Sequence, residues 1–245
     1  MGVTRLPNGI TSNDPNDPIL ADLPITAPQR VFMHFDDFTE SPSSWVNAET
    51  SLAWPYRVEE GPGTGINDIS AVATAPFGAI EFDCGSEANA LTFFTAITRS
   101  FEIVAGRPVW FEALFTVLAP AVLADMEMFV GLSNSTGAPP PSDDGAYFFM
   151  DAGGDIRFEC RHNGFTEISE VMGTVELGVE QKVGFYFDGS AVRWAYQGIV
   201  SGKAAIEDLP LGEIDIMAGI ANVNIGTARM QLDYFMIAQR RVALS

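Results

Sequence analysis

Glu213 and Asp215 are the residues of this sequence best placed to do chemistry together, because their carboxyl groups stand two positions apart. They begin the run Glu-Ile-Asp-Ile-Met-Ala, in which acidic and apolar residues alternate at first. This alternation predicts a β-strand with both carboxyl groups on one face. Two carboxyl groups about 5 Å apart can cleave a glycosidic bond, one as nucleophile and the other as general acid.

The run is similar to the catalytic strand of glycosidases of the laminarinase and lichenase family, which carry a Glu-x-Asp-x-(x)-Glu motif on a β-sandwich. The resemblance implies that Glu213 and a second glutamate would face one cleft. Met217, Ala218 and Gly219 stand where that glutamate should fall. Since retaining hydrolysis needs both carboxyl groups, we predict that the chain has no catalytic residues and is not an enzyme.

Side chains for other catalytic or metal-binding chemistry are few. His34 and His162 are the two histidines, which is too few for a zinc site. Acidic pairs that could bind Ca²⁺ stand at three places, Asp36-Asp37, Asp143-Asp144 and Asp151 with Asp155. None has the spacing of an EF-hand loop, and solvated loop carboxylates are the ordinary alternative in an acidic chain. We expect no metal site and no cofactor.

Cys84 and Cys160 could form one disulfide, but their surroundings favour buried thiols. Each ends a short stretch in which apolar residues alternate with charged ones, Ile-Glu-Phe-Asp-Cys and Ile-Arg-Phe-Glu-Cys. The alternation predicts that both cysteines lie on the inward face of a strand. Because the amino terminus also lacks the apolar run of a signal peptide, we expect a protein made in a cytoplasm.

The composition predicts a globular chain with a large core and an acidic surface. Of the 245 residues, 47% are hydrophobic, including 18 Phe, and only 18% are charged. Lys and Arg number 13 against 32 Asp and Glu, which gives a formal net charge of −19. Such a charge repels phosphate backbones and anionic lipids, so we expect no nucleic-acid partner and no membrane partner.

Strands dominate from residue 31 onward. Residues 109–117 show the clearest alternation, with an apolar side chain at every odd position. Asn163-Gly164 and Asp188-Gly189 predict two hairpins with type I′ turns, and Gln197-Gly198 predicts a third reversal. Only residues 120–129 favour a helix, with Pro120 at a first-turn position. Further strands are expected at 156–160, 165–169, 182–187, 191–196, 199–204, 213–222 and 229–238.

This pattern predicts an all-β fold in which residues 31–245 form one two-sheet antiparallel sandwich, because many strands follow one another without βαβ alternation. Residues 1–30 differ, since their five prolines cannot extend a helix or lie inside a sheet. They predict an extended N-terminal arm. The arm is either a floppy terminus or a segment that orders across another subunit, with anchors among Leu6, Ile10, Ile19, Leu20 and Leu23.

A series of short motifs connects the chain to a known family. They are Gly-Val-Thr-Arg-Leu-Pro-Asn-Gly-Ile at 2–10, Phe-Asp-Asp-Phe at 35–38, Trp-Phe-Glu-Ala at 110–113, Asp-Gly-Ala-Tyr-Phe at 144–148, Gly-Phe-Tyr-Phe-Asp-Gly at 184–189 and Leu-Asp-Tyr-Phe at 232–235. In this order the chain resembles virion structural proteins of short-tailed bacteriophages, of the head decoration or cement type, with a concanavalin-like jelly-roll sandwich. The match runs from end to end, and residues 2–10 are its most specific part.

The resemblance implies a non-enzymatic capsid decoration protein on the outer surface of a phage head, assembled in the host cytoplasm. Its partners would be the major capsid protein and further copies of itself, as a homotrimer. The candidate contact residues are Arg5, Leu6, Pro7 and Ile10 of the arm. Arg5 would offer a forked donor to a carboxylate or to backbone carbonyls, while Leu6 and Ile10 would fill apolar pockets.

A glycan-binding, lectin-like virion module on the head or the tail is the alternative function. Such a module would present a sheet face with exposed aromatic and acidic side chains. Trp54, Tyr56, Trp194 and Tyr196 distinguish the two hypotheses. If these rings are buried in the sandwich, the glycan hypothesis is weakened.

Overall fold

The computed structural model describes residues 18–19, 31–36, 38, 56–60, 68–72, 78–96, 101–119, 123–134, 144–206, 213–224 and 226–240. Within these ranges every regular element is a β-strand except the 3-10 helix η3 (Leu123–Asp125). The helix expected at 120–129 is therefore wrong. In residues 123–129, the described part of that stretch, the structure has η3 and the start of a strand at Met126. None of the helices in the described part of the chain is long and apolar enough to cross a membrane.

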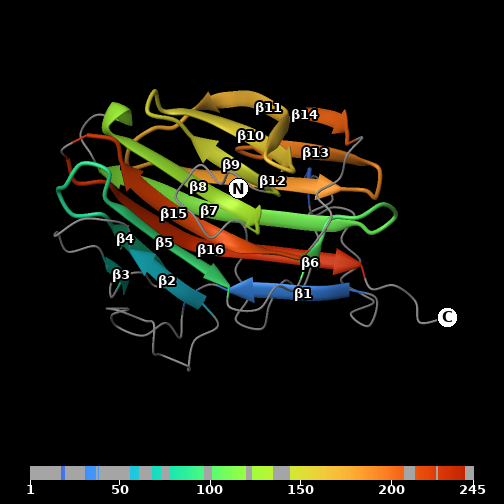
Figure 1. Cartoon of the computed structure of the whole chain (residues 1–245), viewed down its shortest axis with the longest axis horizontal. Coiled ribbons are helices and arrows are strands. Elements are labelled where there is room, and N and C mark those ends of the chain that lie inside the picture. Colours follow the sequence, from blue (N-terminus) through green and yellow to red (C-terminus); the bar gives the residue numbers. More distant parts are fainter. Residues whose placement is uncertain are drawn as a thin grey trace.

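The strands form two antiparallel sheets, as predicted (Figure 1). Sheet A has the order β14 (Ile199–Ala205), β13 (Ala191–Tyr196), β12 (Glu180–Phe187), β7 (Val109–Ala119), β16 (Arg229–Arg240), β4 (Ile80–Asp83) and β3 (Asp68–Ala71), and β1 (Val31–Asp36) also pairs with β16. Sheet B has the order β11 (Phe165–Thr174), β10 (Asp155–His162), β9 (Gly145–Met150), β8 (Met126–Ser133), β15 (Glu213–Asn222), β5 (Leu91–Ala96) and β2 (Tyr56–Glu60), and β6 (Phe101–Glu102) also pairs with β15.

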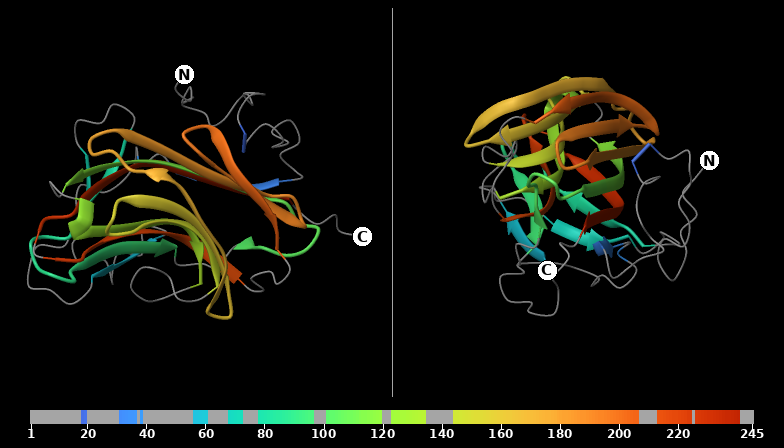
Figure 2. Two further views of the ribbon diagram at one scale, coloured as in Figure 1. Left: turned by 90° about the horizontal axis from the view of Figure 1, so that it is seen from above. Right: turned by 90° about the vertical axis from the view of Figure 1, so that its right-hand side faces the viewer.

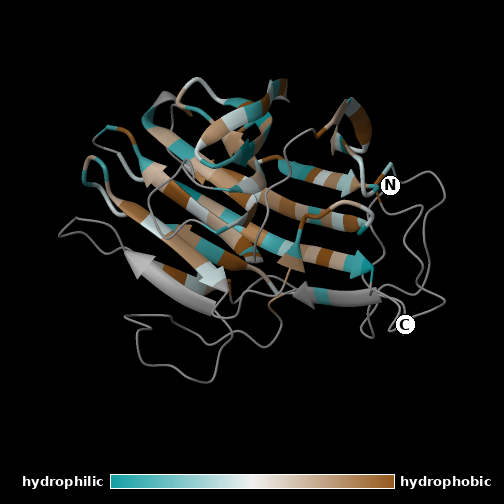
Figure 3. Cartoon of the chain, turned by 45° about the vertical axis from the view of Figure 1, so that its right-hand side comes forward, coloured by the Kyte–Doolittle hydropathy of each residue, from teal (hydrophilic) through white to brown (hydrophobic). Residues whose placement is uncertain are grey.

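Alternation of side chains builds the core between the two sheets, and Figure 3 shows it as bands of colour along the strands. On β7, Val109, Phe111 and Phe115 are fully buried and face sheet B. Rings from both sheets then meet face to face or edge to face. Phe111 stacks on Phe185 within sheet A at 5.4 Å and reaches Phe148 of sheet B at 6.4 Å between ring centroids. Each fully buried Phe stabilises the sandwich by roughly 2–3 kcal/mol relative to an exposed one.

The expected reversals are all present, but their turn geometries differ. At Asn163-Gly164 both residues have positive φ, 50° and 77°, which agrees with the predicted type I′ turn. At Asp188-Gly189 only Gly189 has positive φ, so the type I′ turn predicted there is wrong. There the Asp188 carboxylate accepts the backbone N–H groups of Ser190 and Ala191, at 2.9 and 2.8 Å. Both bonds lower the pKa of Asp188, and the bond from Ala191 has the largest effect.

The two sheets bow in the same direction, and sheet B lies on the inner side of the bow (Figure 2, left). Each sheet has one face toward the core and one away from it. We call the second the outer face. The outer face of sheet B carries the β15 residues that the sequence singles out. The outer face of sheet A carries the described residues of the N-terminal arm.

Candidate functional site

Strand β15 places Asp215 on the outer face of sheet B, because Ile214 and Ile216 on either side of it lie in the core. Asp215 is only 5% exposed. Glu213 lies in the same strand, where its backbone is paired with Glu102 of β6. Met217, which stands where a second glutamate would be needed, is 1% exposed. The strand is therefore present as predicted, and Met217 supplies no second carboxyl group.

Met217 belongs to an apolar cluster that fills the middle of this face. Its members, all buried, are Leu91, Phe93, Phe129, Tyr147, Phe149 and Met217. Glycines on the neighbouring strands let the rings approach closely. A Cβ at Gly219 would lie 2.3 Å from the Cβ of Phe93, and a Cβ at Gly131 would lie 2.4 Å from the Cα of Tyr147. We call this cluster the apolar middle, and none of its members is more than 7% exposed.

Next to the apolar middle, strand β10 places a row of charged residues on the same face. Arg157, Glu159 and Arg161 are half-buried and alternate with the core residues Phe158 and Cys160. The neighbouring edge strand β11 adds the exposed Ser169 opposite Glu159 and Thr166 opposite Arg161. We call Arg157, Glu159, Arg161, Thr166 and Ser169 the polar margin.

Two hydrogen bonds fix the carboxylate of Glu159 in the polar margin. The hydroxyl of Tyr147 on β9 donates to Oε2 at 2.9 Å, and the hydroxyl of Ser169 on β11 donates to Oε1 at 3.2 Å. Burial, and next the charge of Glu159, raise the pKa of Tyr147 far above its usual value. Tyr147 thus stays protonated and remains a donor. The carboxylate is oriented from both sides before any ligand arrives.

Asp151 supports the neighbouring part of the margin. One of its oxygens accepts the backbone N–H groups of Gly153 and Asp155, at 2.9 and 3.3 Å, and the other pairs with Arg157. Glu127 on β8 lies nearby. Burial, and next the charge of Asp151, raise the pKa of Glu127 above its ordinary value. Among the described side chains, carboxylates therefore outnumber cations on this part of the face.

A row of polar and small residues connects the margin to β15. Arg161 is opposite Gly145, Gly145 is opposite Ser133, and Ser133 is opposite Asp215 in the strand register. Ser133 donates its hydroxyl to the backbone carbonyl of Asp144 at 3.1 Å. The two parts that sequence reasoning treats separately, β15 and β10, thus lie on one face.

The sequence prediction missed the polar margin, although its signal was present. Arg-x-Glu-x-Arg at 157–161 alternates with core residues, and that alternation was used only to place Cys160 on an inward face. Tyr147 could not be linked to Glu159 without the register of β9 against β10. Charged residues that alternate with core residues along a predicted strand should therefore be considered as candidate binding-site residues.

The histidines and cysteines do not meet in a site. His34 lies on β1 and stacks on Phe235, with ring centroids 5.5 Å apart. His162 lies at the end of β10, with its Nδ1 3.8 Å from Oδ1 of Asp144. Cys84 and Cys160 are free and buried, which confirms the prediction of reduced core thiols. Burial raises the pKa of each thiol to about 12.

Metal-binding clusters are absent from the part of the chain that the structure describes, where no three His, Cys, Asp or Glu side chains are grouped to hold an ion. Asp151 and Asp155, one of the acidic pairs considered above, make hydrogen bonds within the protein instead. Asp155 accepts the hydroxyl of Thr174 at 3.0 Å. Asp37 and Asp143 lie outside the described residues.

Of the four aromatic side chains expected to distinguish the two functions, the structure describes those of Trp194 and Tyr196. Trp194 is 3% exposed and stacks on Phe158 in the core, with ring centroids 5.0 Å apart. Tyr196 is half-buried, and its hydroxyl bonds to Gln181. Trp54 and the side chain of Tyr56 lie outside the described residues. The burial of Trp194 weakens the glycan hypothesis at this position, as the sequence-based criterion states, and excludes a sugar platform there.

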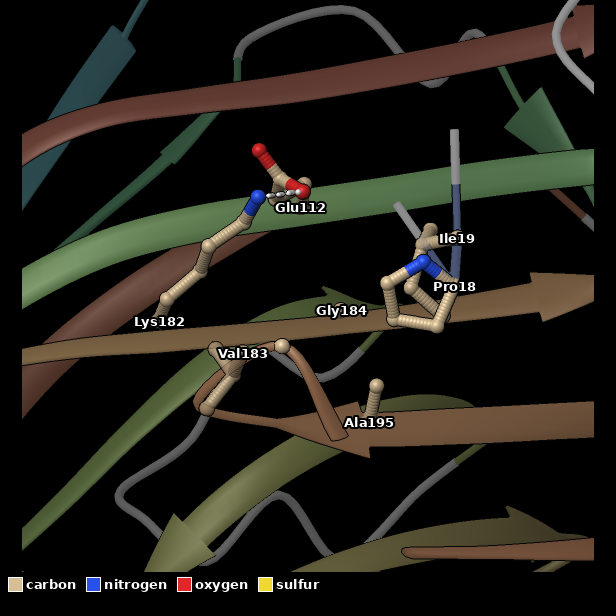
Figure 4. A pocket seen from close by; sticks show the side chains of 8 residues that line it. Pro18, Ile19, Glu112, Lys182, Val183, Gly184 and Ala195 are labelled. Carbon is tan, nitrogen blue, oxygen red and sulfur yellow. Dashed lines mark ion pairs between the residues drawn. The ribbon is translucent and has the colours of Figure 1, made fainter. Parts of the chain in front are cut away.

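The outer face of sheet A is covered by the arm at Ile19. Ile19 is 2% exposed and packs against Trp110, Ala195 and Met236. Figure 4 shows Pro18 and Ile19 above Gly184, where a Cβ would lie 3.0 Å from Cγ1 of Ile19. Within the described residues, Ile19 thus packs on its own chain. The predicted contact residues Arg5, Leu6, Pro7 and Ile10 lie outside the described residues.

A buried polar cluster lies beside Ile19. Glu112 is nearly inaccessible, and its carboxylate pairs with Nζ of Lys182 at 2.8 Å. It also accepts the hydroxyl of Tyr234 at 2.6 Å. Figure 4 shows that Glu112 and Lys182 point toward each other, not toward the surface around Ile19. This cluster has a structural role, since its charges satisfy one another.

Comparison with solved structures identifies the fold. The endo-1,3-β-glucanase from Streptomyces sioyaensis is similar over 88% of this chain and 98% of its own, with a TM-score of 0.62 and 13% identity. An endo-β-1,4-glucuronan lyase from Trichoderma reesei is similar over 83% and 94%, with a TM-score of 0.54 and 10% identity. The carbohydrate recognition domain of Emp47p is similar over 75% and 87%, with a TM-score of 0.54 and 14% identity. No family model and no curated protein matches the chain.

These similarities confirm the predicted concanavalin-like jelly-roll sandwich. They also overturn the prediction that the chain is not an enzyme, because glucanases and polysaccharide lyases share its fold. That prediction depended on the missing second glutamate, which is a requirement of retaining hydrolysis. A lyase eliminates and does not hydrolyse, so the absence of this glutamate is no argument against that class of enzyme.

Nothing in the comparisons points to a phage virion protein. The capsid partner, the homotrimer and the location on a phage head are not tested by them and stay predictions. The neighbours with a stated activity bind or cleave carbohydrates, which agrees better with the alternative function than with the capsid role.

Proposed function

We propose that this protein binds a polysaccharide on the outer face of sheet B, along the polar margin of β10 and β11. The observation that carries the proposal is the fixed carboxylate of Glu159, held by Tyr147 and Ser169 on a half-buried strip of polar residues. The solved structures with the same fold, whose names state carbohydrate binding or cleavage, support it.

The chemistry of Glu159 suits sugar hydroxyl groups. A carboxylate has about four acceptor positions, and Tyr147 and Ser169 occupy two of them. The remaining two can accept vicinal hydroxyl groups in charge-assisted hydrogen bonds, which are stronger than neutral ones. Because the carboxylate is already oriented, binding loses little side-chain entropy. The half-buried Arg157 and Arg161 flank it on β10.

Titration calorimetry with soluble β-glucan and polyuronate oligosaccharides tests the proposal. We expect binding by the wild type and at least tenfold weaker binding by Glu159→Gln, which keeps the shape but loses the charge. Glu170→Gln is the matched control, because Glu170 is exposed on β11 opposite the core residue Phe158 and lies outside the margin. If no oligosaccharide binds the wild type, or if both variants bind equally well, the proposal is wrong. Assays for reducing ends and unsaturated ends in the same mixtures report any cleavage.

A further inference from the structure

We infer that the glycan bound at the polar margin is uncharged, as in a β-glucan, and is not a uronic acid polymer. The inference rests on the proposed function and names its substrate class. The solved structures of this fold include enzymes for both classes, so the fold itself does not choose between them. The charges on the outer face of sheet B favour the uncharged class.

Carboxylates outnumber cations around the margin. Arg157 and Arg161 are its two cations. Among the described residues, the carboxylates on or next to β10 are Asp151, Asp155 and Glu159, whereas Glu127 of β8 and Asp215 of β15 lie farther across the same face. A polyuronate brings one negative charge with each sugar, and a charge placed along β10 would lie near the oriented carboxylates of Asp151 and Glu159. Like charges near a low-dielectric surface repel by a substantial energy, because little water lies between them.

The two arginines are already engaged by the protein. Arg157 pairs with Asp151, which also accepts two backbone N–H groups. Arg161 lies beside the hydroxyl of Tyr147. A uronate carboxylate would have to replace these contacts, and the displaced carboxylate of Asp151 would then be left close to it. Sugar hydroxyl groups require no such exchange, since they donate to the free acceptor positions of Glu159.

The charge of the whole chain acts in the same direction. A formal net charge of −19 slows the approach of any polyanion at low ionic strength, where screening is weak. A neutral glucan is unaffected. The affinity for a β-glucan should therefore change little with salt, whereas any residual polyuronate binding should increase as salt is added.

The test compares laminarin and lichenan oligosaccharides with alginate and glucuronan oligosaccharides of equal length, by titration calorimetry at low and high salt. We expect binding of at least one neutral set and none of the acidic sets at low salt. Glu159→Lys should lose tenfold or more in affinity for the neutral sugar and gain measurable affinity for the acidic ones. Glu170→Lys makes the same change in net charge outside the margin and should do neither, and thermal melting of both variants verifies folding.

The outcomes separate the two proposals. Binding of an acidic set in preference to the neutral sets overturns the inference and leaves the proposed function standing. Binding of neither class overturns the proposed function and the inference with it. An equal gain of polyuronate affinity in Glu159→Lys and Glu170→Lys would show that net charge acts alone, and the assignment to the margin would be wrong.

Discussion

The outer faces of the two sheets bury their apolar side chains in different ways. Both faces lie outside the main core, and both carry apolar side chains whose exposure to water would be unfavourable. Sheet A seats a residue of its own N-terminal arm, Ile19, against Trp110 and Met236. Sheet B packs its rings against one another and against glycines, and it leaves charged side chains half-buried along β10.

The difference shows which buried charges serve folding and which are available to a ligand. On sheet A, Glu112 is enclosed and its carboxylate meets Lys182 and Tyr234, so its interactions are complete within the protein. On sheet B, Glu159 is oriented by two hydroxyl groups but stays partly open to solvent. A fixed and accessible carboxylate is a feature of a binding site, whereas an enclosed one is a feature of a core.

Met217→Glu should have the largest effect, because it places a carboxyl group in the apolar middle of sheet B. A fully buried carboxyl group has its pKa raised by about 3 units, which corresponds to a loss of about 4 kcal/mol of stability at neutral pH. Because the folded-state pKa is raised, the loss shrinks as the pH falls toward about 4. Urea unfolding at both pH values measures it.

Met217→Leu is the control for that substitution, since a volume-conserving apolar exchange costs less than about 1.5 kcal/mol. A Met217→Glu variant that is as stable as the wild type at neutral pH would show that the middle of this face is open to water. Sheet B would then offer a broad cleft and not a margin.

Lys182→Met tests the enclosed cluster of sheet A. Removing one partner of a buried pair leaves an uncompensated charge, and we expect a loss of about 3 kcal/mol in the free energy of unfolding. Combining it with Glu112→Leu and Tyr234→Phe removes all three polar groups together. This triple variant should recover most of the loss, because well-packed apolar side chains can replace a buried ion pair. If it is the less stable of the two, the cluster contributes more than mutual neutralisation.

Ile19→Ala tests whether the arm seals sheet A. Ile19 is buried, and truncation of a buried Ile should cost roughly 2 kcal/mol. Trp110 beneath it should become accessible to acrylamide, which fluorescence quenching measures. Val171→Ala, an exposed position on β11, is the control and should change neither quantity. Unchanged quenching in Ile19→Ala would mean that the arm does not protect this face.

Much of the fold could be predicted from local patterns. The alternation at 109–117 predicted β7 because burial of one strand face requires that spacing. The error at 120–129 shows the limit of local preference. Met126, Met128 and Val130 fill the core, and their strand pairs on both sides with β15 and β9. Tertiary pairing outweighed the weak helical preference of the segment.

The site was less predictable than the fold, because it depends on register. Residues 147, 159 and 169 are far apart in the sequence and become neighbours only through the pairing of β9, β10 and β11. The sequence analysis considered Met217 only as a position where a second catalytic glutamate is missing. Its role in packing depends on Phe93 and Phe129 of adjacent strands, which the run at 213–218 does not contain.

Glu127→Gln has the smallest expected effect. It tests whether a negative charge beside the apolar middle of sheet B lowers the stability of the folded protein. Burial, and next Asp151, raise the pKa of Glu127. The folded protein therefore binds this proton more tightly than the unfolded chain, whose glutamate pKa is about 4.3. The resulting stabilisation is complete below that pH and is lost as the pH rises through the folded-state value. The glutamine variant does not titrate here, so it should be more stable than the wild type at neutral pH, by less than about 1 kcal/mol because Glu127 is partly solvated. The advantage should disappear near pH 4, and urea unfolding of both proteins across this range measures it.

A variant less stable than the wild type at neutral pH would mean that the ionised Glu127 is attracted to this face. The face would then accept negative charge, and the preference for an uncharged glycan would lose its electrostatic basis.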